Sequence, residues 1–151
     1  MKFSKQEEKK YQQIIEKLKN KNIRMTDIRL AIIAMLIRAE HLTTQEIIKN
    51  LELDFANVNV TSVYNTLDLL LSQHILFANT FNGKSIWYEI ASEKSIHLKC
   101  DECGDVIHIN PITSDKFDFE EVVQLAESKG IKLDHFKIEA HGICQSCRKT
   151  K

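Results

Sequence analysis

Two stretches near the start of the chain place apolar residues at helical spacing. Residues 5–20 are highly charged, and their apolar positions fall on one side of a helix: Tyr11, Ile14, Ile15 and Leu18. A second helix is predicted to begin near Thr26, which is a suitable N-cap with Asp27 in the first turn. It continues through IRLAIIAMLIRA. We therefore expect a charged amphipathic helix followed by a central core helix.

Two further helices are predicted, separated by the connector DFANVNV. Thr43 and Glu46 match a capping box, which predicts a third helix over about 44–52. The fourth helix covers TSVYNTLDLLLSQ, and its buried face is predicted to contain Val63, Leu67, Leu70 and Leu71. The third and fourth helices would form a helix-turn-helix pair.

A β-hairpin is predicted after the fourth helix. ILFANTF and SIWYEI are rich in β-forming residues and flank the turn Asn82-Gly83-Lys84. Helices in this order, followed by a hairpin, are typical of a winged helix-turn-helix, whose fourth helix would enter the major groove of DNA. The pattern alone is equally compatible with an unrelated small helical domain that carries a hairpin.

The pattern changes after Ser92. VIHI at 106–109 and FKIEA at 136–140 are short strand-like runs. A helix near 118–129 lies between them and ends at Gly130, a suitable C′ glycine. These elements predict a small α/β domain.

The chain is therefore predicted to contain two domains. A winged helix-turn-helix domain would cover 1–85, and a small α/β domain would cover 92–151. The hinge between them would lie at about 80–92. The fold class is α+β.

Composition narrows the setting in which such a chain works. The 151 residues are 43% hydrophobic and 28% charged, which is a globular balance. No apolar run approaches the roughly 20 residues of a membrane helix, and MKFSKQEEKK lacks the apolar core of a signal peptide. We expect a cytoplasmic protein without a membrane partner. Residues 1–29 hold nine Lys/Arg against four Asp/Glu, a net +5, which suits either a phosphate-facing helix or a solvated helix face.

The four cysteines form two C-x-x-C pairs. Cys100 and Cys103 form the first, Cys144 and Cys147 the second, and 40 residues separate the pairs. Four thiolates can surround one metal as a tetrahedron, which is the geometry of structural zinc. Gly104 follows the first pair and permits the tight backbone turn, or zinc knuckle, that wraps two cysteines around one metal. A redox pair or an iron–sulfur cluster is the alternative. Because no catalytic triad or phosphate loop is evident, an enzyme is not expected.

Four other residues suggest a second metal site. His97 precedes the first cysteine pair, and His108 lies on the strand that follows it. Glu89 lies on the second strand of the hairpin, and His41 lies between the second and third helices. Any one histidine is more often an ordinary surface or core residue. Together, the four residues could bind Fe²⁺, Zn²⁺, Mn²⁺ or Ni²⁺ exchangeably and clamp the two domains in one orientation.

The sequence resembles the ferric uptake regulator family of bacterial metal-dependent repressors. The matching stretches cover most of the chain from about residue 20: RMTDIRLAIIAML, HLTTQEI, TSVYNTLDLL, HLKCDECG and GICQSC. The resemblance implies a homodimer in which each subunit has an N-terminal winged helix and a C-terminal dimerisation domain. It further implies that an inter-domain metal favours a closed dimer, whose recognition helices match successive half-sites of a double-stranded DNA operator.

The resemblance also implies roles for the proposed ligands. The four cysteines fall on the family's structural zinc ligands. His41, Glu89 and His97 fall on its regulatory ligands. His108 falls where the family usually has an acidic ligand, and Ser95 replaces a usual regulatory histidine. With three imidazoles and one carboxylate, we expect Zn²⁺ or Fe²⁺ as the regulatory metal ahead of Mn²⁺ or Ni²⁺.

Other departures concern an additional metal site that some family members have. Lys94 and Ile96 occupy two of its positions. Phe136 takes the place of a common histidine, and His135 lies one residue before it. That additional site is therefore not expected.

Residues of the first domain are predicted to contact DNA. In the fourth helix, Tyr64 matches the family, whereas Asn65 replaces a usual arginine. Contacts to base edges or nearby backbone are expected from Thr61, Ser62, Tyr64 and Asn65. Phosphate contacts are expected from Lys17, Lys19 and Arg24.

The predicted function is a metal-responsive DNA-binding transcriptional repressor that controls metal homeostasis genes, for zinc or iron uptake. One alternative is a peroxide-sensing repressor on the same scaffold. A second alternative, from a different class, is a zinc-ribbon interaction module without a DNA role.

Overall fold

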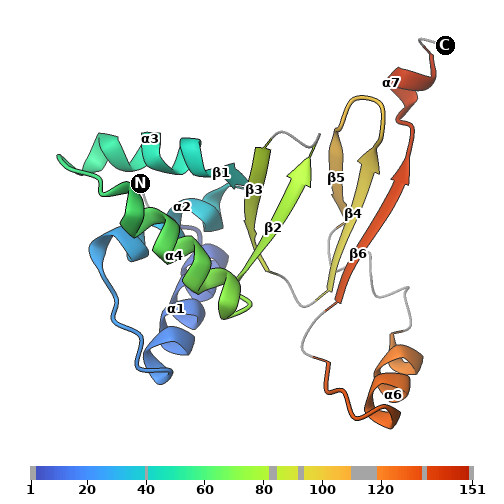
Figure 1. The fold of residues 1–151 in the computed structure, drawn as a ribbon, viewed down its shortest axis with the longest axis horizontal. Coiled ribbons are helices and arrows are strands. Elements are labelled where there is room, and N and C mark those ends of the chain that lie inside the picture. The colour runs from blue at the N-terminus through green and yellow to red at the C-terminus, as the bar shows by residue number, and fades with distance from the viewer. Residues whose placement is uncertain are drawn as a thin grey trace. The chain divides into compact units, whose positions relative to one another are not determined.

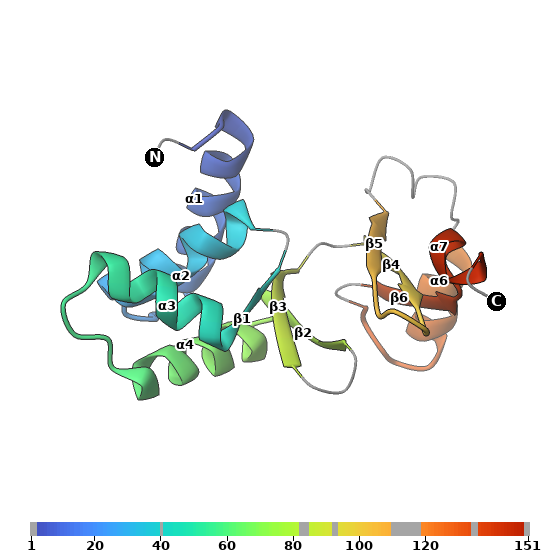
Figure 2. The same cartoon turned by 90° about the horizontal axis from the view of Figure 1, so that it is seen from above.

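A computed structural model describes the chain at residues 3–39, 41–81, 85–91, 94–109, 119–133 and 136–149. The chain divides into two compact units, Met1–Ala91 and Ser92–Lys151. Figures 1 and 2 show that each unit combines helices with a sheet of its own. The predicted hinge at about 80–92 stays a prediction. None of the described helices is long and apolar enough to cross a membrane.

The helices of the first unit begin at residues that satisfy their free N–H groups. These helices are α1 (Lys5–Asn20), α2 (Asp27–Arg38), α3 (Thr44–Asp54) and α4 (Val60–Ser72). The predicted capping box of α3 is confirmed, because the Glu46 amide donates to Thr43 Oγ1 at 3.2 Å and the Thr43 amide donates to Glu46 Oε2 at 2.8 Å. Asn59 caps α4. Such caps each contribute about 1 kcal/mol and set where the helices begin.

An antiparallel sheet completes the first unit. Its strands are β1 (Leu42–Thr43), β2 (Leu76–Phe81) and β3 (Ser85–Ile90), in the order β1-β3-β2. β2 and β3 form the predicted hairpin, with Leu76 opposite Ile90. The predicted turn at 82–84 lies outside the described residues. β1 was not predicted, because a strand of two residues is too short to show alternation.

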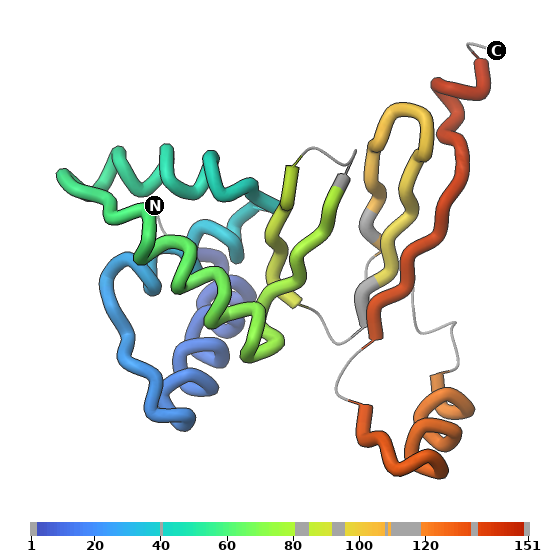
Figure 3. Tube along the Cα trace, in the orientation of Figure 1, coloured from blue at the N-terminus to red at the C-terminus, as the bar shows by residue number. Residues whose placement is uncertain are grey.

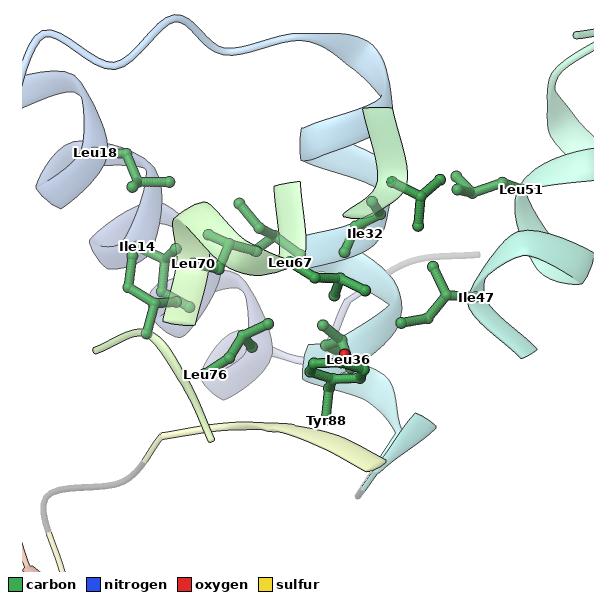
Figure 4. Close-up of a cluster of buried hydrophobic side chains, with 13 residues drawn as sticks. Ile14, Leu18, Ile32, Leu36, Ile47, Leu51, Leu67, Leu70, Leu76 and Tyr88 are labelled. Carbon is green, nitrogen blue, oxygen red and sulfur yellow. The ribbon is translucent and has the colours of Figure 1, made fainter. Parts of the chain in front are cut away.

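The core of the first unit lies between the four helices and one face of the sheet (Figure 4). Its buried side chains come from every helix and from the sheet: Ile14, Leu18, Ile32, Ile33, Leu36, Ile47, Leu51, Val63, Leu67, Leu70, Ile75, Leu76 and Tyr88. Burial of each large apolar side chain contributes about 1.5–3 kcal/mol. Of the residues predicted on the buried face of α4, Val63, Leu67 and Leu70 are buried and Leu71 is partly buried against the core, while Thr66 is buried on the same face. Packing against the core thus holds one face of α4, and the opposite face of this helix is exposed.

The second unit is built on a mixed sheet with the order β5-β4-β6 (Figure 3). Its elements are β4 (Lys94–Cys100), β5 (Val106–Ile109), α6 (Glu120–Ser128), β6 (Phe136–Gly142) and α7 (Gln145–Arg148). β4 pairs antiparallel with β5 and parallel with β6. The predicted end of α6 is confirmed, since Gly130 follows it at φ +76°. β4, the central strand, was not predicted.

Candidate metal centre

The four cysteines converge in the second unit. Their sulfur atoms all lie within 4.8 Å of one another, and Cys103 Sγ lies 3.8 Å from Cys144 Sγ. Zinc–sulfur bonds of about 2.3 Å in a tetrahedron separate the sulfur atoms by about 3.8 Å. Cys100 is buried, while Cys103 is exposed. The distances and the all-sulfur donor set therefore fit a structural zinc ion.

The parallel pairing of β4 and β6 brings the two cysteine pairs together. Cys100, at the end of β4, is in register with Gly142, at the end of β6. The Asp101 amide donates to the Gly142 carbonyl at 2.9 Å, which extends the pairing beyond the last residue of β4. Cys144 follows two residues after Gly142. Motifs 40 residues apart in the sequence thus meet at the same end of neighbouring strands (Figure 1).

The turn after β4 folds the first cysteine pair around a small loop. The Gly104 amide donates to the Cys100 carbonyl at 2.8 Å, and the Cys100 amide donates to the Asp105 carbonyl at 2.8 Å. Gly104 has φ +79°, a left-handed conformation that residues with a Cβ atom rarely adopt. The predicted role of Gly104 in the knuckle is confirmed.

The electrostatics of the cluster favour a bound cation. Backbone N–H groups of Cys103 and Cys144 lower the pKa of the Cys100 thiol to about 6, and the Cys144 amide lies 3.3 Å from Cys100 Sγ. By contrast, the side chains of Cys144 and Cys103 raise the pKa of Cys147 to about 12. One thiolate is therefore stable in the cluster, but four require a positive charge among them. A divalent metal supplies that charge when it binds.

The two predicted regulatory ligands of the first unit, His41 and Glu89, lie against β3 and on β3. His41 lies between α2 and β1, and its ring packs edge-on against Trp87 with 4.5 Å between ring centroids. Glu89, on β3, is 5% exposed and accepts a hydrogen bond of 2.9 Å from Asn79 Nδ2. Asn79 is in register with Trp87, so Glu89, Asn79 and Trp87 share one face of the sheet.

The other two predicted regulatory ligands lie in the second unit. His97, on β4, is 2% exposed and is in register with His108 on β5. Two of the four predicted ligands thus belong to each unit. Among the residues that the structure describes, only the cysteines converge as a group of three or more metal-ligating side chains. The regulatory site therefore stays a prediction. His135 lies outside the described residues.

Two positions of the additional site that the sequence does not lead us to expect, Ile96 and Phe136, hold packed apolar side chains. Ile96 is 3% exposed. The Phe136 ring packs against Phe119, with 4.7 Å between the centroids.

A row of hydrogen-bonded side chains in the second unit is not predicted from the sequence. His141 Nδ1 lies 2.8 Å from Asp101 Oδ1, and His141 Nε2 lies 3.0 Å from Glu139 Oε1. The hydrogen bond to Asp101 raises the pKa of His141, and Glu139 raises it further. The available signal was the alternation in FKIEAHG, which puts Glu139 and His141 on one face of a strand.

The face of α4 opposite the core carries the predicted base-contacting residues. Thr61, Ser62, Tyr64 and Asn65 are all exposed, and Tyr64 is 49% exposed. The predicted phosphate contacts, Lys17, Lys19 and Arg24, are also exposed. The helix geometry is compatible with these roles, which stay predictions.

A winged helix followed by a small α/β unit with a four-cysteine cluster identifies the chain as a winged-helix protein with a candidate metal site. The model of the ferric uptake regulator family matches residues 20–141 of the chain. The chain belongs to the ferric uptake regulator family. Members of this family are transcription regulators and not enzymes.

Similar proteins include regulators of more than one kind. The peroxide operon regulator of Bacillus subtilis is 31% identical over 139 residues, which span 91% of this chain and 92% of that protein. A solved structure of PerR from Streptococcus pyogenes, a protein of peroxide sensing and gene regulation, is 27% identical to this chain in sequence. Its TM-score is 0.52, and the match covers 91% of this chain and 92% of that chain. A zinc uptake regulator complexed with zinc and DNA is 22% identical, with a TM-score of 0.59 and coverage of 97% and 98%. The last similarity shows a shared fold.

Proposed function

We propose that this protein is a metal-responsive transcriptional repressor that binds a double-stranded DNA operator as a homodimer. The observation that carries this proposal is the two-sided character of α4. Val63, Thr66 and Leu67 anchor one side in the core, while Tyr64 and Asn65 stand exposed on the other. A helix held rigidly with a polar outer face suits insertion into the major groove, where asparagine can read adenine through two hydrogen bonds.

The second unit offers a surface for a second copy of the chain. Leu98 and Ile107 are 39% and 60% exposed, and Ile143 is 41% exposed. These residues line a hollow of about 480 Å³ on the sheet. Exposed apolar side chains in one patch favour association, which removes them from water. Two copies related by a two-fold axis would present two α4 helices to successive half-sites of an operator.

Two kinds of metal site serve this function. Structural Zn²⁺ is proposed at Cys100, Cys103, Cys144 and Cys147. A regulatory divalent metal, Zn²⁺ or Fe²⁺ ahead of Mn²⁺ or Ni²⁺, is proposed at His41, Glu89, His97 and His108. The donor set of imidazole and carboxylate suits exchangeable binding of these ions. Since two ligands belong to each unit, this metal would bind one arrangement of the units more tightly, and that differential affinity drives the switch.

The regulated genes are proposed to serve zinc or iron uptake. A peroxide-sensing repressor is the second candidate, and the identity to the peroxide operon regulator of Bacillus subtilis favours it. The discriminating measurement is mass spectrometry of the iron-loaded dimer after peroxide treatment. A gain of one oxygen on His41 or His97 supports peroxide sensing, while an unmodified protein supports a metal sensor.

The proposal is tested by elemental analysis of the purified dimer before and after mild chelation, with DNA binding measured in each state. The operator is a duplex selected from a random-sequence pool by the metal-loaded protein. One zinc per chain should resist chelation, while a second metal and DNA binding should be lost together. If no duplex is bound at any metal concentration, the chain acts as a zinc-ribbon interaction module and the repressor proposal is wrong.

The role of α4 is tested by Tyr64→Ala. Because Tyr64 is exposed and outside the core, the variant should fold and keep its zinc content. Loss of its contact should weaken operator binding by about 1–3 kcal/mol, which is roughly 5- to 150-fold. Binding is titrated at fixed salt, with Glu127→Ala on α6 as a control that should leave affinity unchanged. An unaltered affinity for Tyr64→Ala would remove Tyr64 from the interface.

A further inference from the structure

The parallel pairing of β4 and β6 places a carboxylate beside His97. His97 is in register with Glu139 on one side and with His108 on the other. Residues in register on neighbouring strands point to the same face of a sheet, and the strands lie about 4.8 Å apart. The side chains of His97 and Glu139 can therefore reach one metal ion, which holds such ligands at about 2.0–2.2 Å.

Glu139 is oriented by a row of hydrogen-bonded side chains. Its Oε1 atom lies 3.0 Å from His141 Nε2, and the other ring nitrogen of His141 lies 2.8 Å from Asp101 Oδ1. That contact uses one oxygen of the Glu139 carboxylate, so the second oxygen can serve as a ligand. Carboxylates that bind metals are commonly held in this way by hydrogen-bonding neighbours. The Glu139 side chain is 34% exposed, so a metal could reach it from solvent.

The structure points to Glu139 as a further ligand of the proposed regulatory metal, beside His97 on the face of the second sheet. This inference rests on the function proposed above. Ser95, two residues before His97 on the same strand, offers a hydroxyl in place of an imidazole, and a hydroxyl is a weak metal ligand. Glu139 would complete the set from the neighbouring strand. A carboxylate beside His97 would make the donor set of the second unit richer in oxygen, which shifts preference from tetrahedral Zn²⁺ toward Fe²⁺ or Mn²⁺.

The test uses Co²⁺ as the probe, added to the dimer that already contains its structural zinc. Visible absorption of bound Co²⁺ reports its coordination, and titration reports affinity. Glu139→Gln, which keeps the size of the side chain, should alter the spectrum and weaken Co²⁺ binding by more than the roughly 10–100-fold that loss of an outer-shell partner costs. Zinc content should stay unchanged. Glu120→Gln is the matched control, because Glu120 is an exposed carboxylate on α6, and this variant should bind Co²⁺ like the native protein.

Two further variants separate the possible failures. His141→Gln removes the imidazole that holds Glu139 but keeps the carboxylate, so its Co²⁺ spectrum should change less than that of Glu139→Gln. Equal changes in both variants would overturn direct ligation and assign the effect to the hydrogen-bonded row. His97→Ala should abolish Co²⁺ binding at this site. If His97→Ala abolishes binding while Glu139→Gln leaves it intact, Glu139 is not a ligand and the proposed function stands. If neither variant changes Co²⁺ binding, the regulatory site itself is wrong.

Discussion

The cysteine centre and the predicted regulatory site differ in which of the two units supplies their ligands. All four cysteines belong to the second unit, and backbone pairing between β4 and β6 brings them together. The regulatory residues come equally from both units. A metal bound inside one unit adds its binding free energy to the folding of that unit. A metal whose ligands are divided between units can act on the arrangement of those units. If the predicted regulatory residues bind a metal, ligand placement in the fold would separate a stabilising metal from a signalling one.

The largest effect is expected from breaking the cysteine centre. Cys100→Ser removes the buried ligand, and structural zinc sites contribute about 10–16 kcal/mol of apparent binding free energy at neutral pH. The variant should lose its zinc and unfold the second unit, while the first unit keeps its own core. Elemental analysis and NMR spectra of the two units check this, with Ser146→Ala as the control inside the second cysteine pair. Full zinc content in Cys100→Ser would show that three cysteines suffice.

A smaller effect on stability is expected from a core substitution in the first unit. Leu67→Ala leaves a cavity in the core of the first unit, where Leu67 is fully buried, and should lower the free energy of unfolding by about 2–5 kcal/mol. Its zinc content should not change, because the cysteines lie in the other unit. Urea denaturation and elemental analysis test both points. Leu53→Ala is the control, since Leu53 is 80% exposed and its loss should change stability by less than about 0.5 kcal/mol. Loss of zinc in Leu67→Ala would contradict this independence.

The smallest effect concerns His141, next to the zinc knuckle. Its hydrogen bond to Asp101 raises its pKa above the ordinary value of 6.5. A raised pKa in the folded state means that the protonated form stabilises the fold. That contribution is complete below the unfolded pKa and disappears as pH rises through the folded pKa. NMR titration of the ring should show a raised pKa, and Asp101→Asn should lower it. Asp105→Asn serves as the control. A titration unmoved by Asp101→Asn would mean that the contact does not persist in solution.

Much of the first unit was predictable because its signals are local. The capping box at Thr43 and Glu46 and the β-rich runs around residues 82–84 depend on neighbours within a few residues. The degree of burial along the core face of α4 has a tertiary cause. α4 turns Thr66 toward the core and leaves Leu71 at its edge. Helical periodicity identifies a stripe of residues, but contacts with other elements decide which edge of the stripe is buried.

The second unit was less predictable because its sheet joins distant segments. The sequence does not predict β4: Ile96, Leu98 and Cys100 alternate with polar residues, but the same run contains candidate metal ligands and its pairing partners lie elsewhere in the chain. The row formed by Asp101, His141 and Glu139 depends on the parallel register of β4 with β6. No local pattern contains that register, because it is set by pairing between strands about 40 residues apart.

The sequence by itself determined the four-sulfur donor set and the order of the helices and the β-hairpin. Two C-x-x-C pairs carry their ligand type and spacing within four residues each, and helix periods and caps are equally short in range. Only the tertiary structure decided that β6 runs parallel to β4, and therefore that Glu139 lies beside His97. The physical reason is that strand register comes from hydrogen bonds and side-chain packing across the sheet, which depend on the whole unit folding together.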